Sequence, residues 1–252
     1  MILEAKNISF SYGKKEVLKG VDFYLKDGDI LSLLGKNGCG KTTLLKILLG
    51  ICKSSGEIKL YGKDLKSYSR KDIAKLIAYI PQVHKIPFDY TVFDVVLMGR
   101  LPHIGLFSKY SQEDKDIALN SLKRVGMESF TQKIYSKISG GERQLVFIAR
   151  AIAQDAKIIF MDEPINGLDY GNQIKFLKLL KDFQKEGYTF LKTTHYPDHA
   201  LYASNRITMI KDGSIFKDGL LEELNEKSIE ALYGVDVEII QKNGYKFCIP
   251  TF

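Results

Sequence analysis

The apolar positions change their period along the first fifty residues. Alternating apolar positions predict short strands at Leu3–Phe10 and Val17–Leu25. The next apolar segment, Ile30–Leu34, is almost continuous, which is typical of a strand buried on both faces. Leucine and isoleucine then recur at helical spacing over Thr42–Gly50. We therefore expect Gly35–Thr43 to lie on a turn between a buried strand and a helix.

Two later segments repeat the pattern of a buried strand. They are Ile158–Met161 and Thr189–Thr194, with a helical pattern, Gln173–Phe183, between them. Strands that alternate with helices predict an α/β fold with a mostly parallel sheet that is covered on both sides. The segment from about residue 90 to residue 153 differs, because only helical patterns are found there. We expect it to be a helical insertion, with helices at Val92–Met98, Glu113–Val125 and Gly141–Ala153.

The last thirty or so residues predict a short helix and a hairpin. The helix is expected at Leu220–Leu232, and the two strands at Val237–Ile240 and Tyr245–Ile249. The pair Asn243-Gly244 between the strands is a hairpin signal, because both residues tolerate the left-handed backbone of a tight turn. The pattern assigns no role to this hairpin.

Charge and composition exclude several classes of protein. The 252 residues are 45% hydrophobic and 27% charged, which predicts a folded globular chain. The net charge of +7 comes from 31 lysines and 6 arginines without a basic block, and arginine is the residue preferred for bidentate phosphate and guanine contacts. We therefore expect no nucleic acid partner and interpret the lysines as a solvated surface, with a weak attraction to acidic partners or anionic lipid headgroups as the alternative.

Cysteine spacing and hydropathy indicate the compartment. Cys39, Cys52 and Cys248 are widely spaced, which argues against a disulfide framework or a zinc site and fits a reducing compartment. The first residues hold an acidic side chain and no apolar stretch of signal-peptide length, so we expect no leader. The apolar runs also stop short of the ~20 residues of a membrane helix. Any membrane role is expected to depend on a partner chain.

The clearest chemical motif is a phosphate-binding loop. Residues 35–42, GKNGCGKT, match G-x-x-x-x-G-K-[ST] in full. Its glycines let successive N–H groups point at phosphate oxygens, and the following helix adds its positive N-terminal end. Lys41 is expected to reach the β and γ phosphates, and the Thr42 hydroxyl to bind Mg²⁺. Cys39 within this loop is interpreted as a small, inert residue, because nothing marks a group that would stabilise its thiolate.

A carboxylate pair follows the second buried strand. Asp162 and Glu163 come directly after Met161. On its own such a pair is often only a helix cap or a solvated turn. Beside a phosphate loop, however, Asp162 can hold the Mg²⁺ shell and Glu163 can orient and deprotonate a water. The two motifs together predict a site of nucleotide hydrolysis.

The phosphate loop and four further motifs, in their order along the chain, resemble those of ABC transporter ATPases. The segment 138–144, ISGGERQ, resembles the signature motif of that family, and NGLD at residues 166–169 looks like its D-loop. Gln82 is similar to the Q-loop glutamine, and His195 to the switch histidine. The resemblance runs from about Leu3 to Gly219.

The resemblance implies a role for each matching residue. ATP and Mg²⁺ are the expected ligands, and Tyr12 is expected to stack on the adenine. Gln82 would contact the Mg²⁺ and the attacking water, Glu163 would be the general base, and His195 would contact the γ-phosphate. The ATP-binding residues it implies are Tyr12, Gly35, Lys36, Asn37, Gly38, Cys39, Gly40, Lys41, Thr42, Thr43, Ser139, Gly140, Gly141 and Asp169, and the Mg²⁺ ligands are Thr42, Gln82 and Asp162.

Two of these residues have ordinary alternatives. Without the motif order, Tyr12 would be interpreted as a packing residue among 14 tyrosines. His195 and His199 form an i, i+4 pair that is compatible with a metal, but Pro197 interrupts the helical spacing and no cysteine or third histidine is close in sequence.

The resemblance also implies a fold. It predicts a P-loop NTPase core of the ABC ATPase type, with an N-terminal antiparallel β subdomain and an inserted helical subdomain. We expect one ABC ATPase domain over residues 1–252. Within it, 1–85 and 155–219 would form the ATP-binding core, 86–154 the helical subdomain with the signature motif, and 220–252 the C-terminal helix and hairpin.

A further segment is similar to one branch of the family. Residues 87–100, PFDYTVFDVVLMGR, followed by Pro102-His103, resemble the segment found in ATPases of iron-siderophore, haem and cobalamin importers, a branch that includes molybdate and tungstate importers. The resemblance implies a homodimer that closes on ATP at the cytoplasmic face of the membrane, under two permease subunits. An extracytoplasmic substrate-binding protein would deliver the substrate to the permease.

Other members of the family fit less well. Repair ATPases need hundreds of residues between the Q-loop and the signature, and here Gln82 and Ser139 are 57 positions apart. Translation factors of the family carry two ATPase units in one chain. A soluble ATPase of iron-sulfur cluster assembly stays open as an alternative, because it shares all the ATP motifs.

Overall fold

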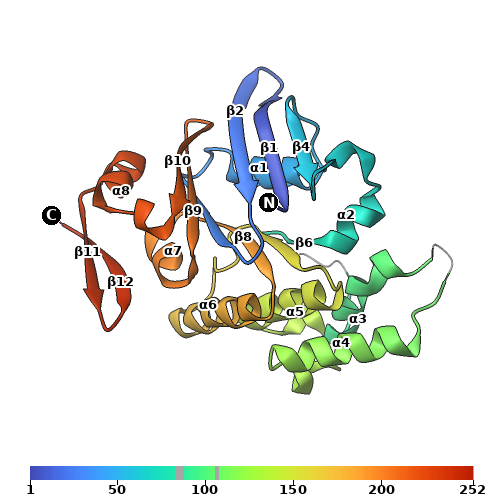
Figure 1. Ribbon diagram of the computed structural model, residues 1–252. Helices are drawn as coiled ribbons and strands as arrows, with labels where there is room; N and C mark the ends of the chain where they lie inside the picture. The colour runs from blue at the N-terminus through green and yellow to red at the C-terminus, as the bar shows by residue number, and fades with distance from the viewer. Residues whose placement is uncertain (83–87, 106–107, 252) are drawn as a thin grey trace. The chain divides into compact units, whose positions relative to one another are not determined.

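The computed structural model describes residues 1–82, 88–105 and 108–251 (Figure 1). The chain forms two compact units. The first consists of residues 1–68 and 180–252, and the second of residues 69–179. Within the described ranges, no helix is long and apolar enough to cross a membrane.

The first unit begins with an antiparallel sheet in the order β2-β1-β4-β5. The two strands predicted at the N-terminus are confirmed, and both are longer than expected. Their register pairs Leu3 with Leu25 and Tyr12 with Lys15, so Tyr12 lies at the turn of the hairpin. The four strands are β1 (Leu3–Tyr12), β2 (Lys15–Leu25), β4 (Glu57–Leu60) and β5 (Lys63–Asp64).

The second sheet of this unit has the order β10-β9-β3-β8. Its middle strand β3 (Ile30–Leu34) is buried at every residue, which confirms the sequence prediction. β3 is parallel to β8 (Thr189–Thr194) and to β9 (Arg206–Lys211), whereas β10 (Ser214–Leu220) is antiparallel to β9. Helix α1 (Lys41–Leu48) follows β3, and α7 (Pro197–Ala203) follows β8.

The C-terminal part of the chain packs on the same unit. The predicted hairpin is confirmed as β11 (Val237–Lys242) and β12 (Tyr245–Pro250), and Asn243 and Gly244 both have a positive φ at its turn. The predicted helix start at Leu220 is wrong. Strand β10 continues to Leu220, a short 3-10 turn follows at Leu221–Glu223, and α8 spans Glu226–Tyr233, because Asn225 caps its first turn in a reciprocal pair with Ser228.

The second unit holds two parallel strands and the predicted helices. β6 (Ile77–Ile80) pairs in parallel with β7 (Ile158–Met161). Several helices begin at a capping box, in which a Ser or Thr side chain and an acidic residue three positions later satisfy each other's backbone N–H groups. The helices are α2 (Arg70–Leu76), α3 (Val92–Leu97), α4 (Gln112–Arg124), α5 (Gly140–Ala153) and α6 (Tyr170–Lys185), of which residues 180–185 belong to the first unit. Short 3-10 turns lie at Met98–His103, Glu128–Phe130 and Tyr135–Lys137.

Helices α3, α4 and α5 pack on one another, so the helical character predicted for this region is confirmed. The predicted boundaries of the helical subdomain stay a prediction. Pro87, the first residue of the segment that is similar to the importer branch, lies outside the described residues.

Candidate functional site

The loop between β3 and α1 has the backbone that its glycines predict. Gly38 has φ 80° and Gly40 has φ 110°, conformations that L side chains rarely adopt. A Cβ at Gly40 would lie 2.7 Å from Leu18 Cδ2, and one at Gly35 would lie 2.5 Å from Cys39 Sγ. The loop is therefore packed closely against β2 and against itself, and only glycine fits at these positions.

Lys41 is folded into this loop. The residue is 6% exposed, and its Nζ donates hydrogen bonds to the carbonyl oxygens of Gly35 (2.7 Å) and Lys36 (3.1 Å). Lys36, Asn37 and Gly38 are exposed at the loop's tip, whereas Thr43 is buried and Thr42 is half-buried. The ammonium group is thus held at the loop, where an anionic oxygen can compete with the two carbonyls for it.

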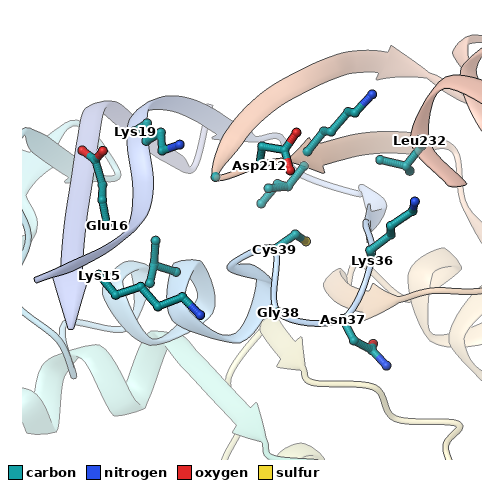
Figure 2. A pocket seen from close by; sticks show the side chains of 13 residues that line it. Lys15, Glu16, Lys19, Lys36, Asn37, Gly38, Cys39, Asp212 and Leu232 are labelled. Carbon is teal, nitrogen blue, oxygen red and sulfur yellow. The ribbon is translucent and has the colours of Figure 1, made fainter.

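A pocket of about 390 Å³ adjoins the loop (Figure 2). Strand β2, the loop and the β9–β10 turn all contribute side chains to it, and lysines come from all three. This excess of positive charge favours an anionic ligand. Figure 2 labels Lys15, Glu16, Lys19, Lys36, Asn37, Gly38, Cys39, Asp212 and Leu232 among its lining residues.

Cys39 is shielded within the loop. Burial raises the pKa of its thiol, although Lys41 and backbone N–H groups act in the opposite direction. A raised pKa disfavours the reactive thiolate. The side chain therefore serves as a small filler beside Gly35, in agreement with the interpretation from the sequence.

His195 directly follows β8, at the same edge of the sheet as the loop. The parallel register pairs Leu34 with Thr194, so Gly35 and His195 both follow directly from a paired position. The His195 ring lies 4.1 Å from the ring of Tyr196, centroid to centroid. Strand pairing thus brings together the two motifs that the sequence separates by about 160 residues.

Tyr12 lies at the end of β1 and is 52% exposed. Its ring makes an edge contact with Phe10, with centroids 4.8 Å apart. About half of the Tyr12 surface is therefore accessible to a stacking partner. Its role toward adenine stays a prediction.

In the second unit, another parallel register assembles the acidic residues. Ile80 pairs with Met161, so Gln82 and the Asp162-Glu163 pair leave their strands at the same edge. Gln82 Nε2 donates to Glu163 Oε2 at 2.9 Å, and Asn166 Nδ2 donates to the same oxygen at 2.6 Å. Two amides from different segments hold one carboxylate oxygen.

Glu163 itself has an unusual backbone. Its φ is 46°, in the left-handed region that is rare for residues other than glycine. Such strain persists only where the surroundings impose it, and it is concentrated at functional sites. The Gln82 and Asn166 amides are part of those surroundings.

Asp162 is buried next to this group, at 2% exposure, and its N–H donates to Ile80 O at 2.9 Å. Burial, together with the nearby Asp162 carboxylate, raises the pKa of Tyr79 to about 12. A carboxylate in this position is suited to bind a cation, because a buried negative charge requires a positive partner.

The signature segment caps α5. Ser139 is the N-cap, with its N–H bonded to Glu142 Oε2 (2.7 Å), and this contact lowers the pKa of Glu142. Gly140 and Gly141 occupy the first helical turn, where backbone N–H groups have no intrahelical acceptor. A Cβ on Gly141 would lie 2.9 Å from Asn172 Nδ2, whereas one on Gly140 would meet nothing closer than 3.8 Å.

Asp169 is exposed at the start of α6. Its carboxylate accepts the Asn172 N–H (2.9 Å) and the Asn172 side-chain amide (2.6 Å), and these bonds lower the pKa of Asp169. It is therefore ionised and held in one orientation.

Sequence reasoning gave no role to two residues of this second group, although one of them, Asn166, begins the segment compared with the D-loop. Asn166 binds Glu163 and Asn172 binds Asp169, in both cases three positions later in the chain. An amide three residues after a functional carboxylate is a signal that could have identified them, because that spacing closes a turn.

Comparisons with known proteins agree with these motifs. A family model described as "ABC transporter" matches residues 18–166, more than half of the 252 residues. The iron(3+)-hydroxamate import ATP-binding protein of Bacillus subtilis is 34% identical over 94% of this chain and 90% of its own. The molybdate import ATP-binding protein of Haemophilus influenzae is 37% identical over 92% of this chain and 87% of its own.

A solved structure extends the similarity to the whole fold. An inward-facing ABC transporter assigned to the metal-chelate type superposes with a TM-score of 0.87 at 33% identity, covering 100% of this chain and 98% of that one. The predicted fold class is confirmed.

Proposed function

Because the chain belongs to the ABC transporter family, as an ATP-binding subunit, we propose that it hydrolyses ATP with Mg²⁺ to drive an importer of metal chelates such as iron-siderophore complexes, haem or cobalamin. The observation that supports ATP hydrolysis is the pair of hydrogen bonds from the Gln82 and Asn166 amides to Glu163, which we call the clamp. A carboxylate fixed in this way beside a buried aspartate is suited to activate water. The 34% sequence identity to an iron(3+)-hydroxamate import ATP-binding protein supports a metal chelate as the transported substrate.

ATP would be bound through the phosphate loop. The N–H groups of residues 35–43 would surround the phosphates, and Lys41 would exchange the Gly35 and Lys36 carbonyls for phosphate oxygens. Tyr12 would stack on the adenine through its exposed ring face. The closely packed glycines support this assignment, because they let the backbone approach a ligand.

The residues present fit a Mg²⁺ ion. A hydroxyl (Thr42), an amide oxygen (Gln82) and a carboxylate (Asp162) are the oxygen donors that Mg²⁺ prefers, and Gln82 can offer Oε1 because Nε2 is bound to Glu163. When bound, Mg²⁺ neutralises charge on the phosphates. Glu163 would accept the proton of the attacking water, and His195 would contact the γ-phosphate.

The signature segment would complete the site of a second copy of this chain. The N–H groups of Gly140 and Gly141 at the start of α5, with Ser139, suit a γ-phosphate. Asp169, oriented by Asn172, would contact the nucleotide across the same dimer interface. The proposed assembly is a homodimer on the cytoplasmic face of the membrane, under two permease subunits. An extracytoplasmic binding protein would deliver the substrate to these permease subunits.

In this proposal one ABC ATPase domain spans residues 1–252. Residues 1–85 and 155–219 would bind ATP, residues 86–154 would transmit closure to the permease, and residues 220–252 would add the C-terminal helix and hairpin. A molybdate or tungstate importer is the second candidate, favoured by the identity to a molybdate import protein. A soluble ATPase of iron-sulfur cluster assembly is the third.

ATP hydrolysis by the purified chain tests the enzymatic part. We expect Mg²⁺-dependent phosphate release from the wild type. The Glu163→Gln variant should release no phosphate and should accumulate as an ATP-bound dimer on size-exclusion chromatography. Glu113→Gln, on the exposed first turn of α4, is the matched control and should keep full activity. Equal activity of Glu163→Gln and the wild type would overturn the assignment of the base.

Affinity purification from the native cell tests the coupling partner. We expect a polytopic permease in the same complex, and chelate-dependent ATPase activity after reconstitution with it. Stimulation by molybdate instead would support the second candidate, and recovery of soluble scaffold proteins would support the third.

A further inference from the structure

Lys192 is a lysine with no exposed surface in the middle of a core strand. It is the fourth residue of β8, its exposure is 0%, and every residue of that strand is buried. A lysine in such a position loses the hydration of its ammonium group, which is costly unless the group forms compensating bonds. The strand ends at Thr194, and His195 follows it.

Two hydrogen bonds fix the end of the Lys192 side chain. Its Nζ donates to Ser32 Oγ at 2.6 Å and to the carbonyl oxygen of His199 at 3.2 Å. Ser32 is the register partner of Lys192 on β3, and its hydroxyl also shares a 2.7 Å hydrogen bond with Ser204. One ammonium group therefore links the strand that enters the phosphate loop to the first turn of α7.

Further contacts connect the same network to the turn that contains His195. Thr194 Oγ1 accepts the Tyr196 N–H at 3.1 Å and lies 3.5 Å from His199 Nδ1. The Tyr196 ring contacts both imidazoles, with its centroid 4.1 Å from that of His195 and 4.9 Å from that of His199. Both ends of the turn, Thr194 and His199, are thus held by hydrogen bonds.

The electrostatics show that this arrangement is costly. Burial lowers the pKa of Lys192 to about 7, and burial, Lys192 and His195 together lower the pKa of His199 to about 4. Within the described residues, no carboxylate pairs with Lys192. An aliphatic residue would avoid this cost, so a purely structural role does not explain a lysine here.

We propose that Lys192 is a positioning residue for ATP hydrolysis, which holds the turn carrying His195 in register with the phosphate loop by bonding β3 and α7 at once. The inference rests on the proposed role of His195 at the γ-phosphate. Lys192 itself touches no substrate. It acts through the carbonyl oxygen of His199, which lies in the first turn of α7.

Lys192→Met is the first test, because methionine is unbranched and almost as long as lysine but makes neither hydrogen bond. We expect the kcat for ATP to fall about tenfold while the KM for ATP changes less than about twofold, because the phosphate loop is intact. Ser204→Ala is the matched control, since it removes a neighbour of Ser32 and leaves the bond to His199, and its kcat should stay within about twofold of the wild type. An unchanged kcat in Lys192→Met would overturn the proposal.

Histidine NMR provides a readout that needs no ATP. The signals of His195 and His199, assigned with His195→Gln and His199→Gln, are titrated in wild type and Lys192→Met. We expect the pKa of His199 to rise by about one unit without the buried ammonium, and the His195 signal to shift. Unmoved signals would contradict the positioning role.

ATPase kinetics and histidine NMR together distinguish a failure of the proposed function from a failure of the proposed role of Lys192. If the wild type hydrolyses no ATP, the proposed function fails, and the NMR signals alone decide whether Lys192 positions the turn. If Lys192→Met does not fold, Ser32→Ala removes one of the two bonds, and a kcat and His195 signal like those of the wild type would then overturn the proposal.

Discussion

Gln82 Nε2 donates a hydrogen bond of 2.9 Å to Glu163 Oε2 across 81 positions of sequence. The contact follows from the parallel pairing of β6 with β7, which ends both strands at the same edge. Because the amide of one segment holds the carboxylate that is proposed to activate water in the other, a shift of one segment changes the orientation of the other.

Gln82→Ala and Asn166→Ala each remove one of the two amides on Glu163. We expect either change to lower the kcat for ATP by about tenfold, because the carboxylate loses its fixed orientation. Only Gln82→Ala should also raise the Mg²⁺ concentration needed for half-maximal rate, since Gln82 is a proposed ligand and Asn166 is not. Steady-state rates over a Mg²⁺ titration measure both effects, and a wild-type kcat in Asn166→Ala would contradict the clamp.

Substitutions at two glycines of the phosphate loop distinguish the effect of backbone strain from that of a steric clash. Gly38→Ala meets no atom within 4 Å, whereas Gly40→Ala would place a Cβ 2.7 Å from Leu18 Cδ2. Both have a positive φ, which costs an alanine about 1–2 kcal/mol. We expect the dissociation constant of ATP, measured by calorimetry, to rise by about tenfold in Gly38→Ala and further in Gly40→Ala. The reverse order would show that the loop rearranges on binding.

Alanine variants of two serines with the same capping role distinguish an effect on stability from an effect on catalysis. Ser111 caps α4 and Ser139 caps α5, each in a capping box. Replacing either by alanine should lower the free energy of unfolding by about 1 kcal/mol in urea titrations. Only Ser139→Ala should also reduce ATP hydrolysis, because its helix end is the proposed γ-phosphate site. Equal losses of activity in both variants would indicate that Ser139 acts through helix stability alone.

Lys192 predicts a dependence of stability on pH. Its pKa of about 7 in the folded chain lies below the ~10.4 of an unfolded lysine, so between these values the unfolded state binds the extra proton. The free energy of unfolding should therefore rise with pH above 7, by up to ~1.4 kcal/mol per unit, and this rise should be absent from Lys192→Met. Urea unfolding at pH 7, 8 and 9 measures it.

Lys178→Met, on the exposed surface of α6, is the control and should follow the wild type. Parallel pH curves for wild type and Lys192→Met would show that Lys192 keeps its proton throughout, and the lowered pKa would then be wrong.

Local patterns in the sequence were sufficient for the phosphate loop, the predicted core strands and the hairpin at Asn243-Gly244. These features depend on residues a few positions apart, such as the glycines that permit a positive φ or the serine and acidic residue of a capping box. The start of α8 was wrong because β10 extends through Leu220, and its pairing with Arg206 is not visible in the local pattern.

The sequence by itself therefore determined which residues are proposed to carry phosphate and hydrolysis chemistry, because each motif is short and contiguous. Only the tertiary structure decided what holds them. The Gln82 and Asn166 clamp on Glu163 depends on the register of β6 with β7 and on a left-handed backbone at one residue. The burial of Lys192 depends on β3 and α7 closing around it, and a lysine in a sequence gives no sign of whether its ammonium group will reach water.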